Sequence, residues 1–389
     1  MRLPDLARAS EIGARFGTRA SIAFVVNTDR FFLTHRASWA RAISAAGGSV
    51  TVIAADTGFA DRIRELGFEF IPVEMGRESV SPLRASQVAW RLFQTLNKGA
   101  YDTVFLVATA AYTLGWFASL TMPSTRFIRV ITGAGRALDG RSTLASLIVG
   151  SQLRFSARRR NVYSIFQLEQ DLDRFLTRKM AVEPRSSVIP GTGIDTRLWN
   201  PAPAQRDPSR PQILFASRLF AEKGIGTYLA VARALADKAE FLVAGAPDLG
   251  VSTSVRPEDI AEWTGVVTYL GQSDDMLGLL QSADVLLFPS THPEGTPRVL
   301  IEAAACGVAI VANDQPGSRA VVGDSAIFID GVDEDDWIRA THEVLEHREL
   351  RHSLGRSARQ YVVEHFDLAQ TLTSVLEIAG VPLARKAPQ

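Results

Sequence analysis

Short apolar runs alternate with amphipathic stretches along most of the chain. In the first half, runs of strand length occupy residues 21–26, 50–55, 68–73, 103–108 and 126–132. In the second half they occupy residues 212–216, 241–244, 267–270, 285–289 and 308–313. Helical patterns separate these runs. Strands that alternate with helices form parallel sheets covered by helices, so the sequence predicts an α/β protein with doubly wound parallel sheets.

A proline-rich segment separates the two series of strands. Residues 200–211 contain four prolines in twelve positions, which is typical of a linker. We therefore expect residues 1–200 to form one Rossmann-like domain and residues 201–365 a second one. Residues 366–389 are predicted to form a helix that returns to the first domain, followed by a polar tail. The first 19 residues are predicted to be an amphipathic leader or a disordered tail.

The composition narrows the classes of function. A chain of 389 residues, of which 46% are apolar, can bury the cores of two domains. The 42 basic and 42 acidic side chains cancel, so nothing requires a nucleic-acid partner. The single cysteine, Cys306, cannot form an internal disulfide, which fits a cytoplasmic location, and its small neighbours predict a buried helical residue. No apolar run reaches the roughly 18 residues of a membrane span.

The most informative stretch is residues 285–307, VLLFPSTHPEGTPRVLIEAAACG. Its first five residues predict a buried strand, and a turn-rich loop follows. Thr296 stands where the N-cap of a helix is expected, Pro297 at the first helical position, and Gly307 at the stop. In open α/β sheets ligands bind at such strand ends, and a helix N-terminus favours a phosphate.

Two carboxylates flank this predicted helix start. Glu294 lies in the loop and Glu302 follows eight residues later inside the helix. Carboxylates only accept hydrogen bonds, and sugar hydroxyls beside a phosphate are suitable donors. The alternative interpretation is a surface ion pair, because Arg298 precedes Glu302 by four residues on the same helix face.

A second polar loop, residues 217–224 (SRLFAEKG), follows the first strand of the second series. Arg218 and Lys223 are placed at the carboxyl end of a strand and before a helix. Two cations there can neutralise a diphosphate, the arginine as a planar fork and the lysine as a point charge. Taken alone, however, two such cations are more often solvated loop residues.

Together these stretches resemble the signatures of the retaining glycosyltransferases of family 4, which have the GT-B fold of two Rossmann-like domains and an interdomain cleft. The matching features are Glu294-x7-Glu302 after a Pro-Ser strand end, and Arg218-Leu219 followed by Glu222-Lys223-Gly224. The resemblance extends from residue 21 to about residue 379 and is more specific in the second half. It implies an enzyme that transfers a hexosyl or N-acetylhexosaminyl group from a nucleotide sugar, with UDP as the favoured nucleotide.

The resemblance also implies roles for individual residues. Glu302 would hold the ribose hydroxyls, Glu294 the donor sugar, and Arg218 with Lys223 the departing diphosphate. The remaining donor-site positions implied are Gly271, Gly295, Thr296, Pro297 and Arg298. The second half has no Asp-x-Asp at a strand end, so no metal is expected to bind the diphosphate.

The acceptor is expected to bind to the first domain. Residues 27–36 are predicted to form a polar loop after the first strand, and Asn27, His35 and Arg36 are its candidate contacts. This loop resembles the N-terminal segment of family members that build bacterial surface polysaccharides. The resemblance implies that the acceptor is a glycan or a lipid-linked acceptor. Thr132 and Gly133 end a later strand, where other members carry a histidine. A histidine base is absent there, so we expect front-side attack with the leaving phosphate as base.

Three further interpretations stay open at this point. Residues 144–160 combine apolar side chains with four arginines, which predicts either a helix with a solvated basic end or a surface that contacts an anionic membrane. A nucleotide-sugar 2-epimerase or hydrolase on the same fold would need acid/base carboxylates in the first domain, where Asp29 is the candidate. A non-catalytic protein that binds a sugar nucleotide is the third alternative.

Overall fold

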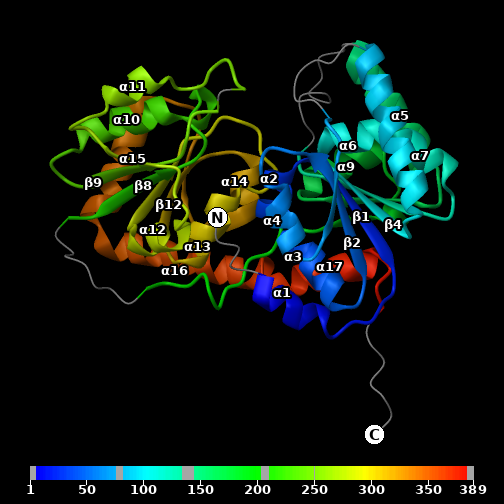
Figure 1. Cartoon of the computed structure of the whole chain (residues 1–389). Helices are drawn as coiled ribbons and strands as arrows, with labels where there is room; N and C mark the ends of the chain where they lie inside the picture. Colours follow the sequence, from blue (N-terminus) through cyan, green and yellow to red (C-terminus); the bar gives the residue numbers. More distant parts are fainter. Residues whose placement is uncertain (1–5, 76–81, 134–143, 203–209, 249, 383–389) are drawn as a thin grey trace, which may run out of the picture. The chain divides into compact units, whose positions relative to one another are not determined.

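The computed structural model describes residues 6–75, 82–133, 144–202, 210–248 and 250–382. Contacts divide the chain into two compact units (Figure 1). The first, called the N-terminal unit here, comprises Leu3–Gly193 together with Leu368–Gln389. The second, the C-terminal unit, contains Ile194–Asp367. Each unit has its own parallel sheet, so the predicted α/β architecture of two Rossmann-like sheets is confirmed.

The sheet of the N-terminal unit has the order β3-β2-β1-β4-β5-β6-β7. Its strands are β1 (Ser21–Thr28), β2 (Ser49–Ala55), β3 (Glu69–Pro72), β4 (Thr103–Val107), β5 (Arg126–Ile131), β6 (Val162–Phe166) and β7 (Ser186–Val188). All their pairings are parallel. The order reverses between β1 and β4, and the carboxyl ends of strands at such a switch point are where ligands bind in open sheets.

Helices surround this sheet (Figure 1). They are α1 (Leu6–Gly13), α2 (Asp29–His35), α3 (Ala37–Ala45), α4 (Ala60–Glu65), α5 (Pro82–Gly99), α6 (Ala108–Leu114), α7 (Trp116–Thr121), α8 (Leu144–Ala157), α9 (Glu169–Thr177) and α17 (Leu368–Ile378). A short 3-10 turn, Glu183–Arg185, precedes β7. The helix α17 comes from the far end of the chain and packs against α1 and α3. Within the described residues, no helix has the length and apolar character needed to cross a membrane.

The sheet of the C-terminal unit has the order β10-β9-β8-β11-β12-β13. Its strands are β8 (Gln212–Ala216), β9 (Glu240–Ala244), β10 (Thr268–Gly271), β11 (Val285–Phe288), β12 (Ala309–Asn313) and β13 (Ile327–Ile329). Successive side chains of β8 enter different cores: Ile213 and Phe215 join one cluster, Leu214 and Ala216 the other. Both faces of this sheet are therefore buried, which explains why its strands are continuous apolar runs.

Helices also cover both faces of this second sheet. They are α10 (Ile225–Ala234), α11 (Pro257–Ala261), α12 (Met276–Ser282), α13 (Arg298–Ala305), α14 (Pro316–Val322), α15 (Glu334–Glu346) and α16 (Arg348–His365). A 3-10 turn, Ala221–Lys223, follows β8. The helix α13 packs between β12 and α16. The prediction that Cys306 is buried is confirmed, since it is 5% exposed and burial raises the pKa of its thiol to about 12.

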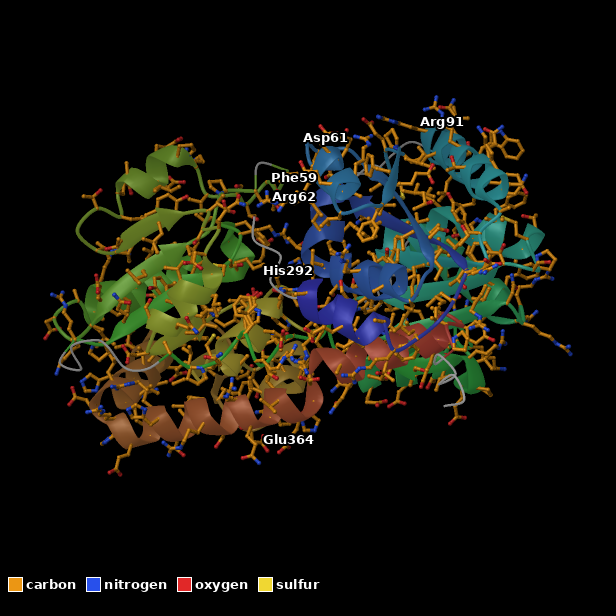
Figure 2. The ribbon with its side chains drawn as sticks, turned by 60° about the horizontal axis from the view of Figure 1, so that its bottom comes forward. Phe59, Asp61, Arg62, Arg91, His292 and Glu364 are labelled. Carbon is orange, nitrogen blue, oxygen red and sulfur yellow. The ribbon has the colours of Figure 1, made fainter. Side chains whose placement is uncertain are left out.

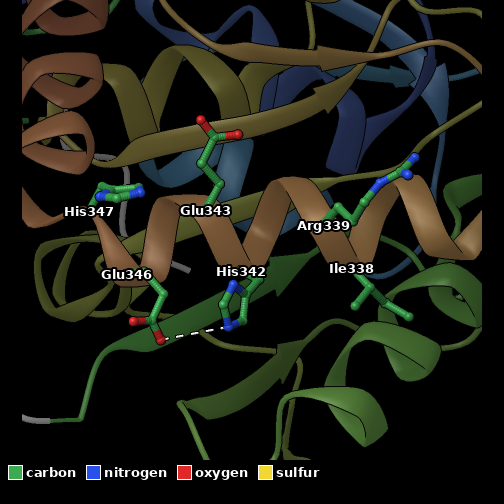
Figure 3. Close-up of a pocket in the computed structure, with 6 residues that line it drawn as sticks. All are labelled: Ile338, Arg339, His342, Glu343, Glu346 and His347. Atoms are coloured by element: carbon green, nitrogen blue, oxygen red, sulfur yellow. Dashed lines mark ion pairs between the residues drawn. The ribbon is translucent and has the colours of Figure 1, made fainter.

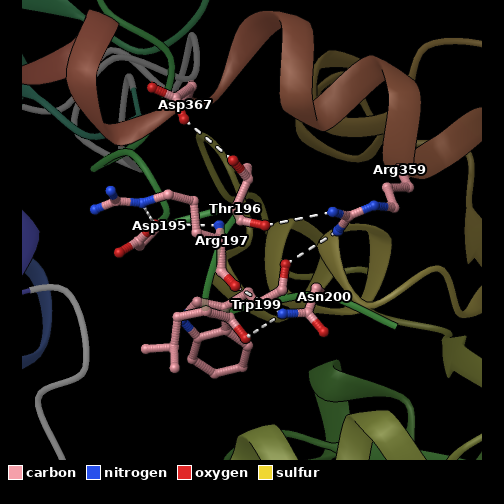
Figure 4. Close-up of polar contacts among 8 residues, drawn as sticks. Asp195, Thr196, Arg197, Trp199, Asn200, Arg359 and Asp367 are labelled. Carbon is pink, nitrogen blue, oxygen red and sulfur yellow. Dashed lines mark hydrogen bonds and ion pairs between the residues drawn. The ribbon is translucent and has the colours of Figure 1, made fainter. Parts of the chain in front are cut away.

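Polar contacts join the two ends of the C-terminal unit (Figure 4). The guanidinium of Arg359 on α16 donates to the carbonyl of Trp199 at 3.0 Å and to that of Thr196 at 3.3 Å. The Thr196 hydroxyl donates to Oδ2 of Asp367 at 3.1 Å. The segment that enters this unit is thereby fixed to the segment that leaves it.

The structure corrects two local interpretations of the first 36 residues. Of the two alternatives for the first 19 residues, an amphipathic leader or a disordered tail, the disordered tail is wrong for residues 6–13, because they form the helix α1, in which Ala9 and Ile12 are buried and which packs against α3 and α17. The predicted loop 27–36 is mostly the helix α2. The side chain of Thr28 caps this helix by accepting a hydrogen bond from the N–H of Phe31 at 3.2 Å. The polar composition of residues 27–36 suggested a loop and obscured this N-cap.

Candidate active site

The loops that carry the predicted donor-site residues meet in the C-terminal unit. The strands β8 and β11 are neighbours, and the sheet order reverses between them, so their carboxyl ends lie at the switch point. The N–H groups of Thr291 and His292 both donate to the carbonyl of Glu222, at 2.9 and 3.1 Å. Figure 2 labels His292 in its loop. Backbone contacts thus bind the two loops together.

Two glycines allow this close approach. Gly224 has φ +80°, and a Cβ there would lie 2.4 Å from the carbonyl oxygen of Pro289. Gly317 at the start of α14 supports the second loop from behind, since a Cβ there would lie 2.4 Å from the Glu294 carbonyl oxygen. Real Cβ atoms do not approach an oxygen this closely, so both positions require glycine.

Lys223 and Glu294, which the sequence placed in different loops, form an ion pair. The lysine side chain is 5% exposed and the glutamate side chain 29% exposed. Burial lowers the pKa of Lys223, while the Glu294 carboxylate acts in the opposite direction, and the nearby Arg218 lowers it further. The result is a buried ammonium group whose carboxylate partner, Glu294, is partly accessible to solvent.

Phe220 organises the two cations, a role that sequence reasoning missed. The ring centroid of Phe220 lies 5.1 Å from the guanidinium carbon of Arg218 and 5.5 Å from Nζ of Lys223. Phe220 is 2% exposed, whereas the Arg218 side chain is 57% exposed and forms an ion pair with Asp248. One feature of the sequence could have indicated this role, because Phe220 lies between Arg218 and Lys223 in the chain. No feature of the sequence indicates the part played by Asp248, which lies in the loop after β9.

Glu302 lies on the first turns of α13 and pairs with Arg298, as the alternative interpretation predicted. Oε1 of Glu302 is 2.7 Å from Nε of Arg298. The helix face is not solvated, however, because Glu302 is 8% exposed and the Arg298 side chain 26%. Burying a carboxylate costs free energy even when it is paired, so this arrangement is more than a surface ion pair.

The start of α13 differs by one residue from the prediction. The helix begins at Arg298 and Pro297 is its N-cap, so the prediction of Thr296 as N-cap is wrong. The hydroxyl of Thr296 is buried and has no hydrogen-bond partner among the residues that the structure describes. The buried Gly295 precedes it, and Gly271 ends β10 with φ +66°. Gly307, with φ +73°, follows the last turn as predicted.

The candidate acceptor residues at the end of β1 have different environments. The side-chain oxygen of Asn27 is buried and makes no hydrogen bond within the described ranges. His35 stacks on Phe31 with ring centroids 4.4 Å apart, and its Nδ1 lies 2.6 Å from the Thr34 hydroxyl. Arg36 is 1% exposed and its guanidinium lies 4.3 Å from the Trp39 ring centroid, so in this structure it supports α2 and α3 from inside.

The carboxyl ends of β1, β4 and β5 are adjacent, because these strands are neighbours in the sheet. Thr132 and Gly133 follow β5, and both are partly exposed. Gly133 has φ +140°, and Ala108 after β4 has φ +69°, an unusual conformation for a residue with a Cβ. Asn27 belongs to the same edge, so the topology brings these predicted acceptor positions to one end of the sheet.

Asp29 has a structural environment that does not suit an acid/base group. It is fully buried, and its carboxylate accepts hydrogen bonds from the N–H groups of Thr57 at 2.8 Å, Phe59 at 2.8 Å and Arg30 at 2.6 Å. Burial alone would raise its pKa, but these bonds and one from the Thr57 hydroxyl lower it overall. The carboxylate thus fastens the loop before α4, which ends at Phe59 (Figure 2), to the start of α2.

A surface hollow elsewhere carries no comparable chemistry. It has a volume of about 520 Å³ and lies along α15, lined by Ile338, Arg339, His342, Glu343, Glu346 and His347 (Figure 3). Nε2 of His342 lies 3.6 Å from Oε1 of Glu346, which also pairs with Lys238 at 3.0 Å. Across the described ranges, no group of three or more His, Cys, Asp or Glu side chains is arranged to hold a metal ion.

Two family models match the chain, one in each half. The model described as glycosyl transferases group 1 matches residues 200–361, which include Arg218, Lys223, Glu294 and Glu302. The model described as glycosyl transferase 4-like matches residues 21–158. Together they cover most of both units.

Similar proteins agree with these matches. A Campylobacter jejuni N,N'-diacetylbacillosaminyl-diphospho-undecaprenol alpha-1,3-N-acetylgalactosaminyltransferase is 24% identical over 332 residues, covering 81% of this chain and 87% of its own. Sucrose-phosphate synthase from Thermosynechococcus elongatus has a similar structure, with a TM-score of 0.74 at 18% identity over 92% of this chain and 98% of its own. Anabaena HepE in complex with UDP-glucose gives 0.71 at 16% identity, with the same coverage.

Proposed function

We propose that this chain, which belongs to the GT-B glycosyltransferases of family 4, transfers a sugar with retention of configuration from a UDP-sugar to a lipid-linked glycan. Its membership rests on the two family models, and the activity of a glycosyltransferase follows from it. The observation that carries the proposal is the ion pair of Lys223 with Glu294, which links the loops that follow two neighbouring strands, β8 and β11, at the switch point. Arg218 belongs to the first of these loops, and Glu302 to the helix that follows the second. The donor, the acceptor and the stereochemistry are the proposed parts.

The donor diphosphate would bind to the two cations beside Phe220. Arg218 is exposed and can exchange its ion pair with Asp248 for a phosphate oxygen. Lys223 is buried and its ion pair with Glu294 fixes the position of its ammonium group. The ammonium group is therefore already in place when the diphosphate binds. The first turn of α13 adds N–H groups and the positive end of the helix dipole.

The two carboxylates would bind the sugars of the donor. Glu302 is nearly buried on α13, and we assign it to the ribose hydroxyls, which would donate to its carboxylate. Glu294 is more exposed and lies in the loop, and we assign it to the hydroxyls of the transferred sugar. Because Glu294 also pairs with Lys223, sugar and diphosphate binding are coupled through this ion pair.

The proposed reaction needs no basic side chain from the protein. The bond between the sugar C1 and the β-phosphate oxygen breaks, and negative charge grows on the leaving diphosphate. Arg218 and Lys223 stabilise that charge, and such preorganised donors contribute about 10²–10³-fold each to catalysis. The acceptor hydroxyl attacks C1 from the same face and transfers its proton to the leaving phosphate oxygen.

The epimerase alternative needs a free carboxyl group in the N-terminal unit. The candidate Asp29 is buried, accepts four hydrogen bonds and has a lowered pKa, so its environment favours a permanently ionised structural carboxylate. Its position supports the transferase over the epimerase.

The proposed acceptor class is inferred from the name of a similar protein. The Campylobacter enzyme is named for an acceptor linked to diphospho-undecaprenol. In this chain the edge formed by Asn27, Thr132 and Gly133 is the proposed acceptor site, with His35 and Arg36 on the adjacent α2–α3 connection. A lipid-linked acceptor would place the enzyme at the cytoplasmic face of a membrane.

The testing experiment is a transfer assay with UDP-GalNAc, UDP-GlcNAc and UDP-glucose and a polyprenyl-diphosphate glycan, in the presence of EDTA. We expect one donor to give a product extended by one sugar, with the α configuration by NMR, and metal-independent turnover. A β-linked product would contradict retention, and UDP release without any acceptor would favour a hydrolase or epimerase. Donor binding without turnover would favour the binding protein.

A further inference from the structure

We propose that the N-terminal unit docks onto an anionic lipid bilayer through the outer faces of α5, α7 and α8. The inference rests on the proposed function in that a lipid-linked acceptor makes such docking useful. Its evidence is a set of large apolar side chains that these three helices leave between 39% and 77% exposed. This set, called the apolar surface here, consists of Leu83, Trp90, Phe117, Leu147, Ile148 and Phe155.

The three helices that carry the apolar surface pack against one another in series, and ring contacts connect α5 to α7. The helix α7 packs against α5 on one side and α8 on the other, and α5 and α7 lie side by side in Figure 1. A row of rings crosses from α5 to α7: Trp90 and Phe93 have centroids 5.3 Å apart, and Phe93 and Phe117 are also 5.3 Å apart. Phe93 is partly buried against the core and anchors the two exposed rings.

The exposed apolar residues recur at helical spacing, so they define the outer face of each helix and are not isolated exposed side chains. On α5, Leu83 and Trp90 are seven residues apart, which places them on the same face. On α8, Ile148 and Phe155 have the same spacing, while Leu153 on the other face is buried in the core. Soluble proteins normally place polar residues on such outer faces, and apolar ones there indicate an interaction surface.

The same part of the chain carries a strong positive charge. Residues 82–168 contain eleven Lys and Arg but only two Asp and no Glu, a net charge of +9 in a chain whose net charge is zero. The helices α5, α7 and α8 contain no acidic residue. Arg91 on α5 projects from the surface in Figure 2, and Arg154 and Arg158 are exposed beside Phe155.

An anionic bilayer fits this combination better than a protein does. Tryptophan rings favour the headgroup level of a membrane, and arginines bury their stems while they contact lipid phosphates. Each basic residue near an anionic surface contributes about 1 kcal/mol to binding, and the effect weakens with salt. Because these helices contain no acid, nothing on them repels such a surface. An acidic protein partner is the competing occupant, and the test separates the two.

The test is vesicle flotation of the full chain with phosphatidylcholine alone and with phosphatidylcholine mixed with phosphatidylglycerol. We expect binding to the anionic vesicles, little to the neutral ones, and release at high salt. Trp90→Ala with Phe117→Ser, and separately Arg154→Glu with Arg158→Glu, should each weaken binding at least about tenfold. The matched controls are Val332→Ser, at an exposed apolar position, and Arg233→Glu, at an exposed basic position, both in the C-terminal unit.

The thermal shift produced by UDP separates the docking proposal from the proposed function. Variants that keep the wild-type UDP shift but lose flotation support the docking surface, because their fold and donor site are intact. Wild-type protein that binds UDP but floats with neither vesicle overturns the docking proposal and leaves the donor assignment standing. Equal flotation of wild type and both double variants also overturns it. Wild-type protein without a UDP shift counts against the donor assignment, whatever the flotation shows.

Discussion

The ammonium group of Lys223, nearly buried after β8, forms an ion pair with the partly exposed carboxylate of Glu294 in the loop after β11. The pair joins the two loops whose backbones already meet at Glu222. Two residues 71 positions apart are thereby coupled, one assigned to the diphosphate and one to the transferred sugar.

Lys223→Ala should reduce kcat/KM at least about tenfold, because the variant lacks the positive charge that stabilises the leaving diphosphate. Folding should be retained, since the abandoned Glu294 is accessible to solvent. Steady-state kinetics and circular dichroism check the two statements. Lys238→Ala removes an exposed, ion-paired lysine elsewhere in the same unit and is the matched control. Wild-type kinetics in Lys223→Ala would contradict the assignment of this lysine to the donor site.

The affinity for UDP should fall as the pH rises through the pKa of Lys223, which burial holds below the ordinary 10.5. The diphosphate binds to the protonated lysine, so deprotonation weakens binding. Glu294→Gln removes the carboxylate that raises this pKa, and the fall should therefore begin at a lower pH. Calorimetric titration with UDP across alkaline pH measures the shift. A fall that starts at the same pH in both proteins would mean that another group controls binding.

Glu302→Ala should weaken UDP binding by about 10–100-fold, the range expected for hydrogen bonds to a charged group. If Glu302 holds the ribose hydroxyls, wild-type protein should prefer UDP to its 2′-deoxy analogue, and the variant should lose most of that preference. Arg298→Ala, which removes the ion-pair partner but no acceptor, is the control. An unchanged preference in Glu302→Ala would contradict the ribose assignment.

Gly224→Ala should impair donor binding because the new Cβ has no room against Pro289 and φ is +80°. The loop of Lys223 must then move away from β11, and we expect UDP affinity to fall at least about tenfold, or 1.4 kcal/mol. Gly226→Ala, two residues later in α10, meets nothing within 4 Å and should be neutral or stabilising. Equal UDP affinity in the two variants would contradict the packing argument.

Asp29→Asn should destabilise the protein by about 1–3 kcal/mol without changing the UDP affinity, because Asp29 fastens Thr57 and Phe59 to α2. The lowered pKa means that this stabilisation is full above about 3.8 and is lost as the pH falls through the folded-state value. Urea denaturation at neutral and acid pH measures both effects. A folded variant with no turnover would instead assign Asp29 a chemical role.

The sequence predicted the two parallel sheets and the donor-site strand ends because the central strands, such as β4, β11 and β12, are apolar runs, and the loops after β8 and β11 carry charged motifs. It did not predict α2, since Asn27, Asp29 and Thr34 suggest a loop, whereas Thr28 and Asp29 act as hydrogen-bond acceptors that start a helix. It also missed Asp248, because that ion pair with Arg218 depends on the neighbouring positions of β8 and β9 in the sheet.

The exposed rings of α5 and α7 were missed for a similar reason. Trp90 and Phe117 are 27 positions apart in the sequence, and only the packing of α5 against α7 brings them into one surface. Periodicity assigns such aromatic residues to a core, and exposure becomes visible only when the neighbouring elements are placed.

The central claim is that the four charged residues at the β8–β11 switch point bind a UDP-sugar. The most direct test is calorimetric titration of the full chain with UDP in EDTA, for the wild type and for Lys223→Ala. We expect saturable, metal-independent binding to the wild type and affinity at least about tenfold lower in the folded variant. Equal affinities, or no binding by the wild type, would contradict it.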